Sequence, residues 1–418
     1  MLLIKGTHLI DRLSQRDETA DILIVDGMVK EIATNIPAPA VAYVIEATGL
    51  IALPGLVDTH AHFRDPGFTH KEDIASGARA MARGGSTSAV LMANTKPCGD
   101  NVATLRYVLE KGAETGLNIT SCANVTCGMK GQELTDMAEL AAAGAAGFSD
   151  DGLPLLDEEL VRAAMREAAR LGKPLCLHEE DPAYIENNGI DQEYAKTRLG
   201  LGGASREAEI ALVRRDLMLA EETGATVVFQ HLSTKEAVEL IRQAKAQNPR
   251  IHAEATPHHF TLTAEALATK EALAKVNPPL RTEADRLAII HGLKDGTIDI
   301  IATDHAPHSA EEKAGPLTAA PSGMIGLETA LSLALRELVA PGYLTLSELV
   351  MRMSTAPARL YGLAAGEIAV GKPADIVLFD PAATWTVDGF ASKSANSPFL
   401  GETLPGVVRH TICGWRII

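Results

Sequence analysis

Short apolar runs alternate with amphipathic stretches through the middle of the chain. Eight of the runs are rich in β-branched residues, which predicts buried strands. They fall at 55–60, 87–92, 118–124, 145–149, 174–178, 226–231, 251–255 and 299–303. Most of the segments between them repeat apolar residues at helical spacing, as in 71–83, 157–171, 206–223, 235–247 and 284–293. Strands and helices alternating eight times predict an α/β fold, a (β/α)8 barrel of the TIM type.

An open, doubly wound sheet would produce the same local alternation. That fold normally carries a phosphate-binding glycine fingerprint in its first strand-to-helix turn. No GxGxxG motif is present in this sequence, so the barrel is the favoured fold and the open sheet is the alternative.

Both ends of the chain have a different, β-rich pattern. The runs 2–5 and 21–25 read as strands, and the Asp26-Gly27 pair predicts a hairpin turn before a strand over 28–32. The last 45 or so residues repeat this style, with predicted strands over 374–379 and in 407–418. Neither end can bury a core alone. We therefore expect residues 1–50 and 365–418 to form one small β-sandwich domain, and residues 51–364 to form the barrel.

Composition narrows the class of protein. Hydrophobic residues make up 46% and charged residues 22% of the 418 residues, as in ordinary globular enzymes. The chain has no run of eighteen apolar residues and no secretory signal pattern at its start, which predicts a cytoplasmic protein. The net charge of −16 argues against binding to nucleic acid or to anionic membranes. The five cysteines form no CxxC pair, so neither a disulfide framework nor a thiolate zinc site is expected.

Histidines and aspartates gather where the predicted strands end. Asp58, His60 and His62 end the first strand, Asp150 and Asp151 the fourth, His178 the fifth, His231 the sixth, and Asp304 and His305 the eighth. The carboxyl ends of barrel strands form the face that carries the active site. The pattern therefore predicts that these side chains converge.

The spacing and the number of these residues predict a metal centre. Residues two apart in a strand point to the same side, so the two imidazoles of an H-x-H motif can hold one ion. Four histidines and two aspartates exceed the three protein ligands of a typical catalytic mononuclear zinc site. One carboxylate can bridge two ions about 3.5–4 Å apart, which makes a two-metal site the expectation. A mononuclear deaminase shares the H-x-H motif and the late aspartate but needs no bridge.

At these residues the sequence resembles the dihydroorotases of the amidohydrolase superfamily. The resemblance covers essentially the whole chain. Its motifs are DTHAHFRDPG at 58–67, MANT at 92–95, GFSDDG at 147–152, VNPPLR at 276–281, ATDHAPH at 302–308, GLET at 326–329 and GEIAVGKPAD at 366–375.

The resemblance implies two Zn²⁺ ions and a role for each ligand. His60, His62 and Asp304 would hold the first ion, and His178 and His231 the second. Many relatives bridge the two ions with a carboxylated lysine, but this chain has Asp150-Asp151 there, as in a bacterial branch that bridges with aspartate. We assign Asp151 as the bridge. By the same resemblance Arg64, Asn94 and His308 would bind the substrate carboxylate, Asn277 would contact the ring, and Asp304 would transfer the proton.

The activity that the resemblance implies is the reversible cyclisation of N-carbamoyl-L-aspartate to L-dihydroorotate in pyrimidine biosynthesis. The alternatives are another cyclic amidohydrolase, such as an allantoinase or dihydropyrimidinase, and a non-catalytic scaffold for aspartate carbamoyltransferase. The presence of all six metal ligands argues against the scaffold as the sole function, although an active enzyme could still bind that partner. A homodimer is expected.

The segment 309–323 follows the last predicted strand and has two interpretations. It is polar, small and punctuated by glycine and proline, without clear periodicity. It is either a surface loop or a mobile lid that excludes water during the reaction.

Overall fold

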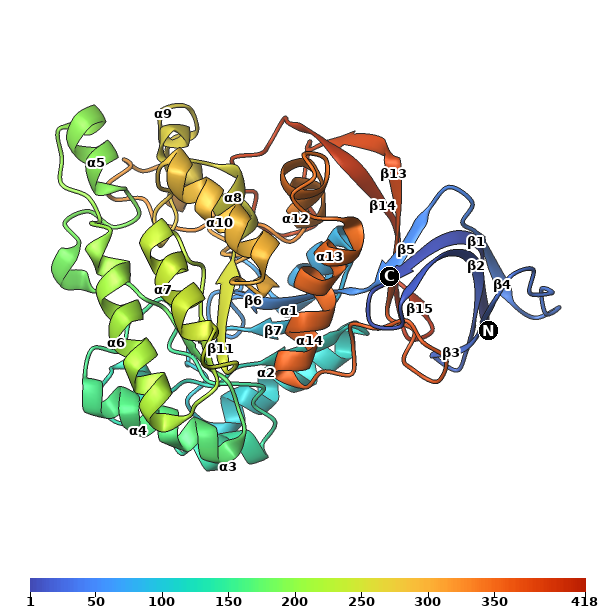
Figure 1. The fold of residues 1–418 in the computed structure, drawn as a ribbon, viewed down its shortest axis with the longest axis horizontal. Helices are drawn as coiled ribbons and strands as arrows, with labels where there is room; N and C mark the ends of the chain where they lie inside the picture. The colour runs from blue at the N-terminus through green and yellow to red at the C-terminus, as the bar shows by residue number, and fades with distance from the viewer.

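Two parallel sheets occupy the centre of the computed structural model, which describes all 418 residues (Figure 1). One consists of β6 (Leu56–Ala61), β7 (Ser86–Leu91) and β8 (Asn118–Ser121). The other consists of β9 (Leu175–Leu177), β10 (Val227–Phe229), β11 (Ile251–Ala255) and β12 (Ile300–Ile301). All seven strands fall within the runs predicted from the sequence or within one residue of them. The fold is mixed α/β.

The predicted strand over 145–149 is replaced by a single bridging residue. Phe148 pairs in parallel with Ala123 on one side and with Leu175 on the other. Gly144 precedes the run with a positive φ of 110°, and Gly147 lies within it, so the backbone does not stay extended for a full strand. At the opposite edges of the two sheets, Ala61 pairs with His305. The two sheets therefore contact each other at both edges through isolated bridges.

Helices pack around these strands (Figure 1). They are α1 (Ile74–Gly84), α2 (Val102–Thr115), α3 (Met137–Ala142), α4 (Glu158–Leu171), α5 (Gln192–Tyr194), α6 (Glu207–Thr223), α7 (Lys235–Lys245), α8 (Pro257–Thr261), α9 (Leu267–Lys270), α10 (Glu283–Asp295), α11 (Ala310–Lys313), α12 (Ala330–Ala334), α13 (Leu346–Val350) and α14 (Ala356–Tyr361). The five helices expected from apolar spacing are all present. Capping residues mark the helix ends. In α1, Asp73 and Ser76 form a capping box at the start, and Gly85, whose φ is 88°, caps the end. None of the helices is both long enough and apolar enough to cross a membrane.

The two chain ends pair in one eight-stranded sheet. Its strands are β1 (Leu2–Asp11), β2 (Arg16–Val25), β3 (Met28–Ala33), β4 (Tyr43–Glu46), β5 (Ile51–Pro54), β13 (Ile376–Thr386), β14 (Thr403–Cys413) and β15 (Arg416–Ile417). The antiparallel pair β13–β5 joins the C-terminal strands to the N-terminal ones. Both termini lie on this side of the molecule, at the right of Figure 1. Because β5 belongs to the sheet, the sheet extends past residue 50 to Pro54.

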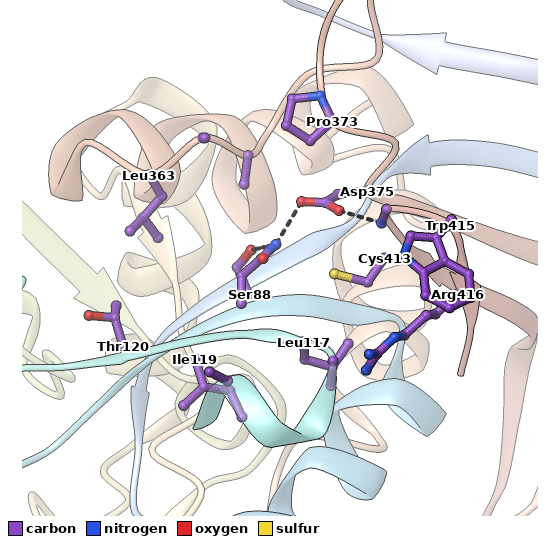
Figure 2. Close-up of a pocket in the computed structure, with 16 residues that line it drawn as sticks. Ser88, Leu117, Ile119, Thr120, Leu363, Pro373, Asp375, Cys413, Trp415 and Arg416 are labelled. Atoms are coloured by element: carbon purple, nitrogen blue, oxygen red, sulfur yellow. Dashed lines mark hydrogen bonds between the residues drawn. The ribbon is translucent and has the colours of Figure 1, made fainter. Parts of the chain in front are cut away.

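A cavity of about 580 Å³ lies at the seam between this sheet and the β6–β7–β8 sheet (Figure 2). Asp375 lies in its wall. One Asp375 carboxylate oxygen accepts a hydrogen bond from Asn118 Nδ2 at 2.7 Å, and the other accepts one from the Gly414 amide at 3.1 Å. Burial raises the pKa of Asp375. The carboxylate thus links β8 to the C-terminal tail, at the amino ends of the parallel strands.

A second buried carboxylate, Asp285, ties three helix starts together. It lies in the first turn of α10, where it forms a capping box with Thr282. Its Oδ1 accepts from the Lys235 amide at the start of α7 (2.9 Å) and from Arg206 Nη2, just before α6 (2.6 Å). Helix N-termini favour negative charge. The burial of Asp285 would raise its pKa, but these donors outweigh burial and lower the pKa to about 2.

We expect Asp285→Asn to destabilise the protein in a pH-dependent way. The folded-state pKa lies below the unfolded value of 3.8, so ionised Asp285 contributes stability above about pH 4 and loses it as the pH falls toward 2. A shift of this size corresponds to about 2 kcal/mol. Urea unfolding of wild type and variant should differ by that order at pH 7 and by clearly less at pH 3. A difference that stays constant over this range would contradict the assignment.

Candidate metal centre

Six side chains from five separate places along the chain meet at one point. His60 lies on β6, and His62 follows it directly; His178 follows β9, His231 comes two residues after β10, and Asp304 comes three residues after β12. Asp151 lies three residues beyond the bridging residue Phe148. All six are buried. The convergence predicted from the sequence is therefore present in the structure.

Asp151 is the centre of this cluster. Its Oδ1 lies 3.3 Å from His60 Nε2, 3.5 Å from His178 Nδ1 and 3.4 Å from His231 Nε2. Its Oδ2 lies 3.3 Å from His62 Nε2. The donor atoms form two overlapping sets, His60–His62–Asp151 and Asp151–His178–His231, each suited to holding one ion. One carboxylate shared by two ligand sets is the arrangement of a bridged two-metal site.

Asp304 adds a second carboxylate to the set of His60, His62 and Asp151. Its Oδ1 lies 2.9 Å from His62 Nε2 and 3.5 Å from His60 Nε2. Both Asp304 and His231 have positive φ angles, of 46° and 34°, which non-glycine residues adopt rarely. Such conformations cost about 1–3 kcal/mol each and cluster at functional sites, where the surrounding structure enforces them. The backbone turns sharply at both residues and directs the side chains into the cluster.

The negative charges in the cluster favour the binding of a cation. Burial would lower the pKa of His60, but the carboxylates of Asp151 and Glu254 outweigh it and raise that pKa well above its usual value. Burial likewise opposes the charged form of His178, yet hydrogen bonds to Asp151 and Glu180 raise its pKa to about 10. The buried atoms His60 Nε2 and Asp151 Oδ1 have no hydrogen-bond partner. The negative field and these unpaired atoms meet where a metal ion would bind.

Outer carboxylates and an amide fix which nitrogen of His60, His62 and His178 faces the cluster. His60 Nδ1 donates to Glu254 Oε1 at 2.8 Å, and His178 Nε2 donates to Glu180 Oε2 at 3.0 Å. His62 Nδ1 donates to Asn94 Oδ1 at 2.9 Å. The opposite nitrogen of each of these three rings faces the cluster, where it would give its lone pair to a bound metal ion in place of a proton.

A small cavity of about 110 Å³ opens beside the cluster. Its wall includes five of the six cluster residues, all but His60, together with Arg64, Asn94, Gly152, Asn277, Ala306, Ser322 and Gly323. Arg64 Nε donates to the Pro307 carbonyl at 3.3 Å, and its two terminal nitrogens form no hydrogen bond with the protein. The buried atoms Asn277 Oδ1 and Ser322 Oγ also lack partners. The wall thus offers free polar groups next to the cluster.

His308 lies beside this cavity and outside its wall. Its Nδ1 donates to Glu312 Oε2 at 3.3 Å, and its amide donates to Asn396 Oδ1 at 3.0 Å. Burial and the neighbouring cations Arg64, Lys71 and Lys313 lower its pKa to about 3. The imidazole is therefore neutral and turned toward Glu312.

The chain matches the Amidohydrolase family over residues 51–417. It is 49% identical over 418 residues to a dihydroorotase from Clostridioides difficile (strain 630), covering 100% of this chain and 99% of that protein. It is 48% identical over 420 residues to a dihydroorotase from Streptococcus pneumoniae serotype 4, with the same coverage. The chain belongs to the dihydroorotases of the amidohydrolase family. It is a hydrolase that acts on cyclic amides.

Solved structures show the same fold. An L-hydantoinase from Arthrobacter aurescens superimposes with a TM-score of 0.89 at 24% identity, over 100% of this chain and 95% of that one. A dihydropyrimidinase from Brevibacillus agri gives a TM-score of 0.87 at 25% identity, over 100% and 94%. These neighbours imply a TIM-barrel with an added β domain. The family is generally metal-dependent, in keeping with the cluster around Asp151.

Several residues of the site were missed by sequence reasoning. Glu254 and Glu180 touch the histidine ligands, and Ser322 and Gly323 line the cavity. Glu180 lies two residues after His178 in HEED, so the i, i+2 spacing used for H-x-H could have indicated it. Nothing local marks Glu254, which lies inside β11 and meets His60 from 194 positions away.

Two neighbours of the predicted ligands have structural roles. The Asp150 carboxylate turns away from the cluster and accepts from the Val125 amide at 2.9 Å and from the Thr126 side chain. His305 Nε2 lies 3.3 Å from Glu72 Oε2, and its Nδ1 accepts from the Gly326 amide at 3.2 Å. His305 therefore anchors the segment that follows the site.

Proposed function

We propose that this site interconverts N-carbamoyl-L-aspartate and L-dihydroorotate, with two zinc ions held around Asp151. The observation that carries the proposal is the position of Arg64, whose terminal nitrogens are free of protein partners on the cavity wall beside the ligand cluster. A guanidinium matches a carboxylate with two parallel hydrogen bonds. L-Dihydroorotate carries a ring carboxylate, and plain dihydrouracil does not.

The ligand assignment follows the geometry. His60, His62 and Asp304 would hold one zinc, His178 and His231 the other, and Asp151 would bridge them. When bound, such a pair of ions would polarise the ring carbonyl and lower the pKa of a water toward about 7. The imidazole and carboxylate donor set suits zinc.

Arg64, Asn94 and Asn277 would orient the substrate. Arg64 would bind the ring carboxylate, while Asn277 has an unpaired buried oxygen available to accept from a ring N–H. Asn94 is already engaged, because its Oδ1 accepts from His62 and its Nδ2 donates to the Asp151 carbonyl at 3.2 Å. Asn94 therefore also fixes two metal ligands, and a contact to the substrate would use its remaining N–H. We propose His308 as a further carboxylate contact, which it would make through Nε2 as the protonated imidazolium, because the neutral ring bound to Glu312 through Nδ1 has only an acceptor at Nε2.

Asp304 is placed to move the proton. It lies on the wall of the cavity, and burial would raise its pKa, but His62, His60 and His231 outweigh this and hold it well below the usual value. Ionised Asp304 can accept the proton of the attacking water and donate it to the leaving ring nitrogen. In the cyclising direction the same carboxylate would carry the proton the opposite way.

We also propose that the two bridged parallel sheets constitute one (β/α)8 barrel, with Phe148 standing in for the fourth strand. Residues 1–50 and 365–418, extended by β5, would form the separate β domain. We expect a cytoplasmic homodimer, with aspartate carbamoyltransferase as a candidate partner.

Substrate comparison tests the function. The purified protein with zinc should turn over L-dihydroorotate at least about 100-fold faster, in kcat/KM, than allantoin or dihydrouracil. A loss of the carboxylate contact alone is worth roughly that factor. Equal or faster turnover of either uncharged ring would point to the other cyclic amidohydrolases.

We expect Arg64→Lys to raise KM for L-dihydroorotate roughly 10- to 100-fold, because an ammonium cannot reproduce the two-pronged contact. Metal content should not change. The control is Arg79→Lys, an exposed position on α1. An unchanged KM for Arg64→Lys, measured by the absorbance change of dihydroorotate, would remove Arg64 from substrate binding.

A further inference from the structure

Segment 309–323 forms part of the substrate cavity rather than a free surface loop. Its last two residues, Ser322 and Gly323, lie in the cavity wall with Asn277. The Gly323 amide donates to the Lys275 carbonyl at 2.8 Å. The end of the segment and the stretch from Lys275 to Asn277 therefore make one continuous wall.

Two buried lysines tie these stretches to each other in opposite directions. Lys275 reaches from the 271–277 stretch into the segment, where its Nζ donates to the carbonyls of Leu317 at 2.8 Å and Ala320 at 2.7 Å. Lys313 reaches back from α11, and its Nζ donates to the carbonyls of Ala272 and Pro321, both at 2.8 Å. The side chains are 3% and 7% exposed.

The lysines lack the partners that buried ammonium groups normally have. Neither Nζ lies within 4.0 Å of a carboxylate, so main-chain carbonyls are their only acceptors. Burial lowers the pKa of Lys275, and burial with the nearby charge of Lys275 lowers the pKa of Lys313 to about 7. Burying an ammonium group without a counter-ion is unfavourable. This unfavourable arrangement occurs at both lysines and around the same segment. We take it to indicate that the two side chains hold the segment in position.

A separate contact holds the end of the segment next to the site. Asn396 Nδ2 donates to the carbonyls of Ala306 at 3.0 Å and Gly323 at 3.1 Å. The lysine ammonium groups bind main-chain carbonyls of residues 317–321, none of which Asn396 contacts. Loss of a lysine is therefore expected to release 314–321 while leaving the metal ligand Asp304 in place.

We propose that Lys275 and Lys313 are positioning residues that clamp segment 309–323 in place, so that Ser322 and Gly323 form a fixed wall for the substrate. The proposal rests on the proposed substrate site. In this arrangement the segment is neither a free surface loop nor a mobile lid. It is a loop whose backbone is held by two buried lysine side chains.

The test compares Lys313→Met and Lys275→Met with Lys294→Met, whose parent side chain is exposed on α10. Methionine keeps most of the length of the side chain, being one atom shorter, and removes its donors. In either clamp variant we expect KM for L-dihydroorotate to rise roughly tenfold with kcat changed less than threefold, because a wall contact acts on bound substrate and transition state alike. Metal per chain and the control variant should match wild type. An unchanged KM would overturn the proposal.

Hydrogen exchange provides a readout that does not depend on activity. In wild type without substrate, the hydrogen-bonded amides of Ala319, Ala320 and Gly323 should exchange slowly. The clamp variants should exchange at least tenfold faster at 314–321 and normally elsewhere. Fast exchange in wild type would contradict the clamp even if neither variant folds. An absence of dihydroorotase activity in wild type with slow exchange would instead refute the proposed function and leave the clamp standing.

Discussion

Replacing Asp151 by asparagine is expected to reduce the metal content from two ions per chain to one or fewer, and to lower kcat by at least about 1,000-fold. Asp151 is the one carboxylate within 3.5 Å of all four histidines. An asparagine offers a single acceptor oxygen, and its NH₂ group would face ring nitrogens that must keep their lone pairs. Metal per chain is measured by elemental analysis after dialysis, and kcat on the same sample.

The neighbouring aspartate provides a matched control. Asp150 is equally buried but points to the Val125 and Thr126 amides. Asp150→Asn should reduce stability while keeping two metals per folded chain. Full metal content in Asp151→Asn, or equal metal loss in both variants, would contradict the assignment of Asp151 as the bridge.

Asp304→Asn is expected to lower kcat by about 100- to 10,000-fold, the usual range for removing a general acid–base group. The amide can still present an oxygen toward His62 and His60, so at least one metal per chain should remain. It cannot accept the proton of the attacking water. Substrate binding through Arg64 is untouched, and KM should change little. Steady-state kinetics in both reaction directions measure the effect.

Asp299 provides the control for this variant, because it lies directly before β12, at the end of the strand opposite Asp304. It accepts from the Ala253 amide at 3.2 Å and pairs with Lys245. Asp299→Asn should leave kcat within about twofold of wild type, since it touches no part of the site. A kcat for metal-loaded Asp304→Asn within tenfold of wild type would exclude Asp304 as the proton carrier.

Strand positions and the convergence of the histidines and aspartates could be predicted because local pattern determines both. An apolar run predicts a strand and therefore the position of its carboxyl end. The H-x-H spacing then predicts that His60 and His62 point to the same side of that strand. The strand over 145–149 was wrong in extent. Apart from Phe148 its residues are small, and Gly144 precedes them while Gly147 lies among them, so they offer little side-chain area to hold an extended pairing. The prediction that Asp151 joins the cluster did not depend on the full strand, because a single bridge at Phe148 is enough to position the turn that follows.

The substrate side of the site was less predictable, because its contacts depend on which side chains pack together across the fold. Asn94 is held by His62 and Asp151, and His308 is turned by Glu312. Neither contact leaves a signal in the local sequence. Lys275 shows the same limit: a lysine in an otherwise ordinary loop is expected at the surface, yet its partners lie more than 40 residues away.

The central claim is that six side chains from five separate segments hold two cations at one mouth of the fold. Anomalous diffraction at the zinc edge, from crystals grown with zinc, tests it most directly. The account predicts two peaks about 3.5–4 Å apart, both within bonding distance of Asp151. A single peak, or two peaks that do not share Asp151, would contradict it.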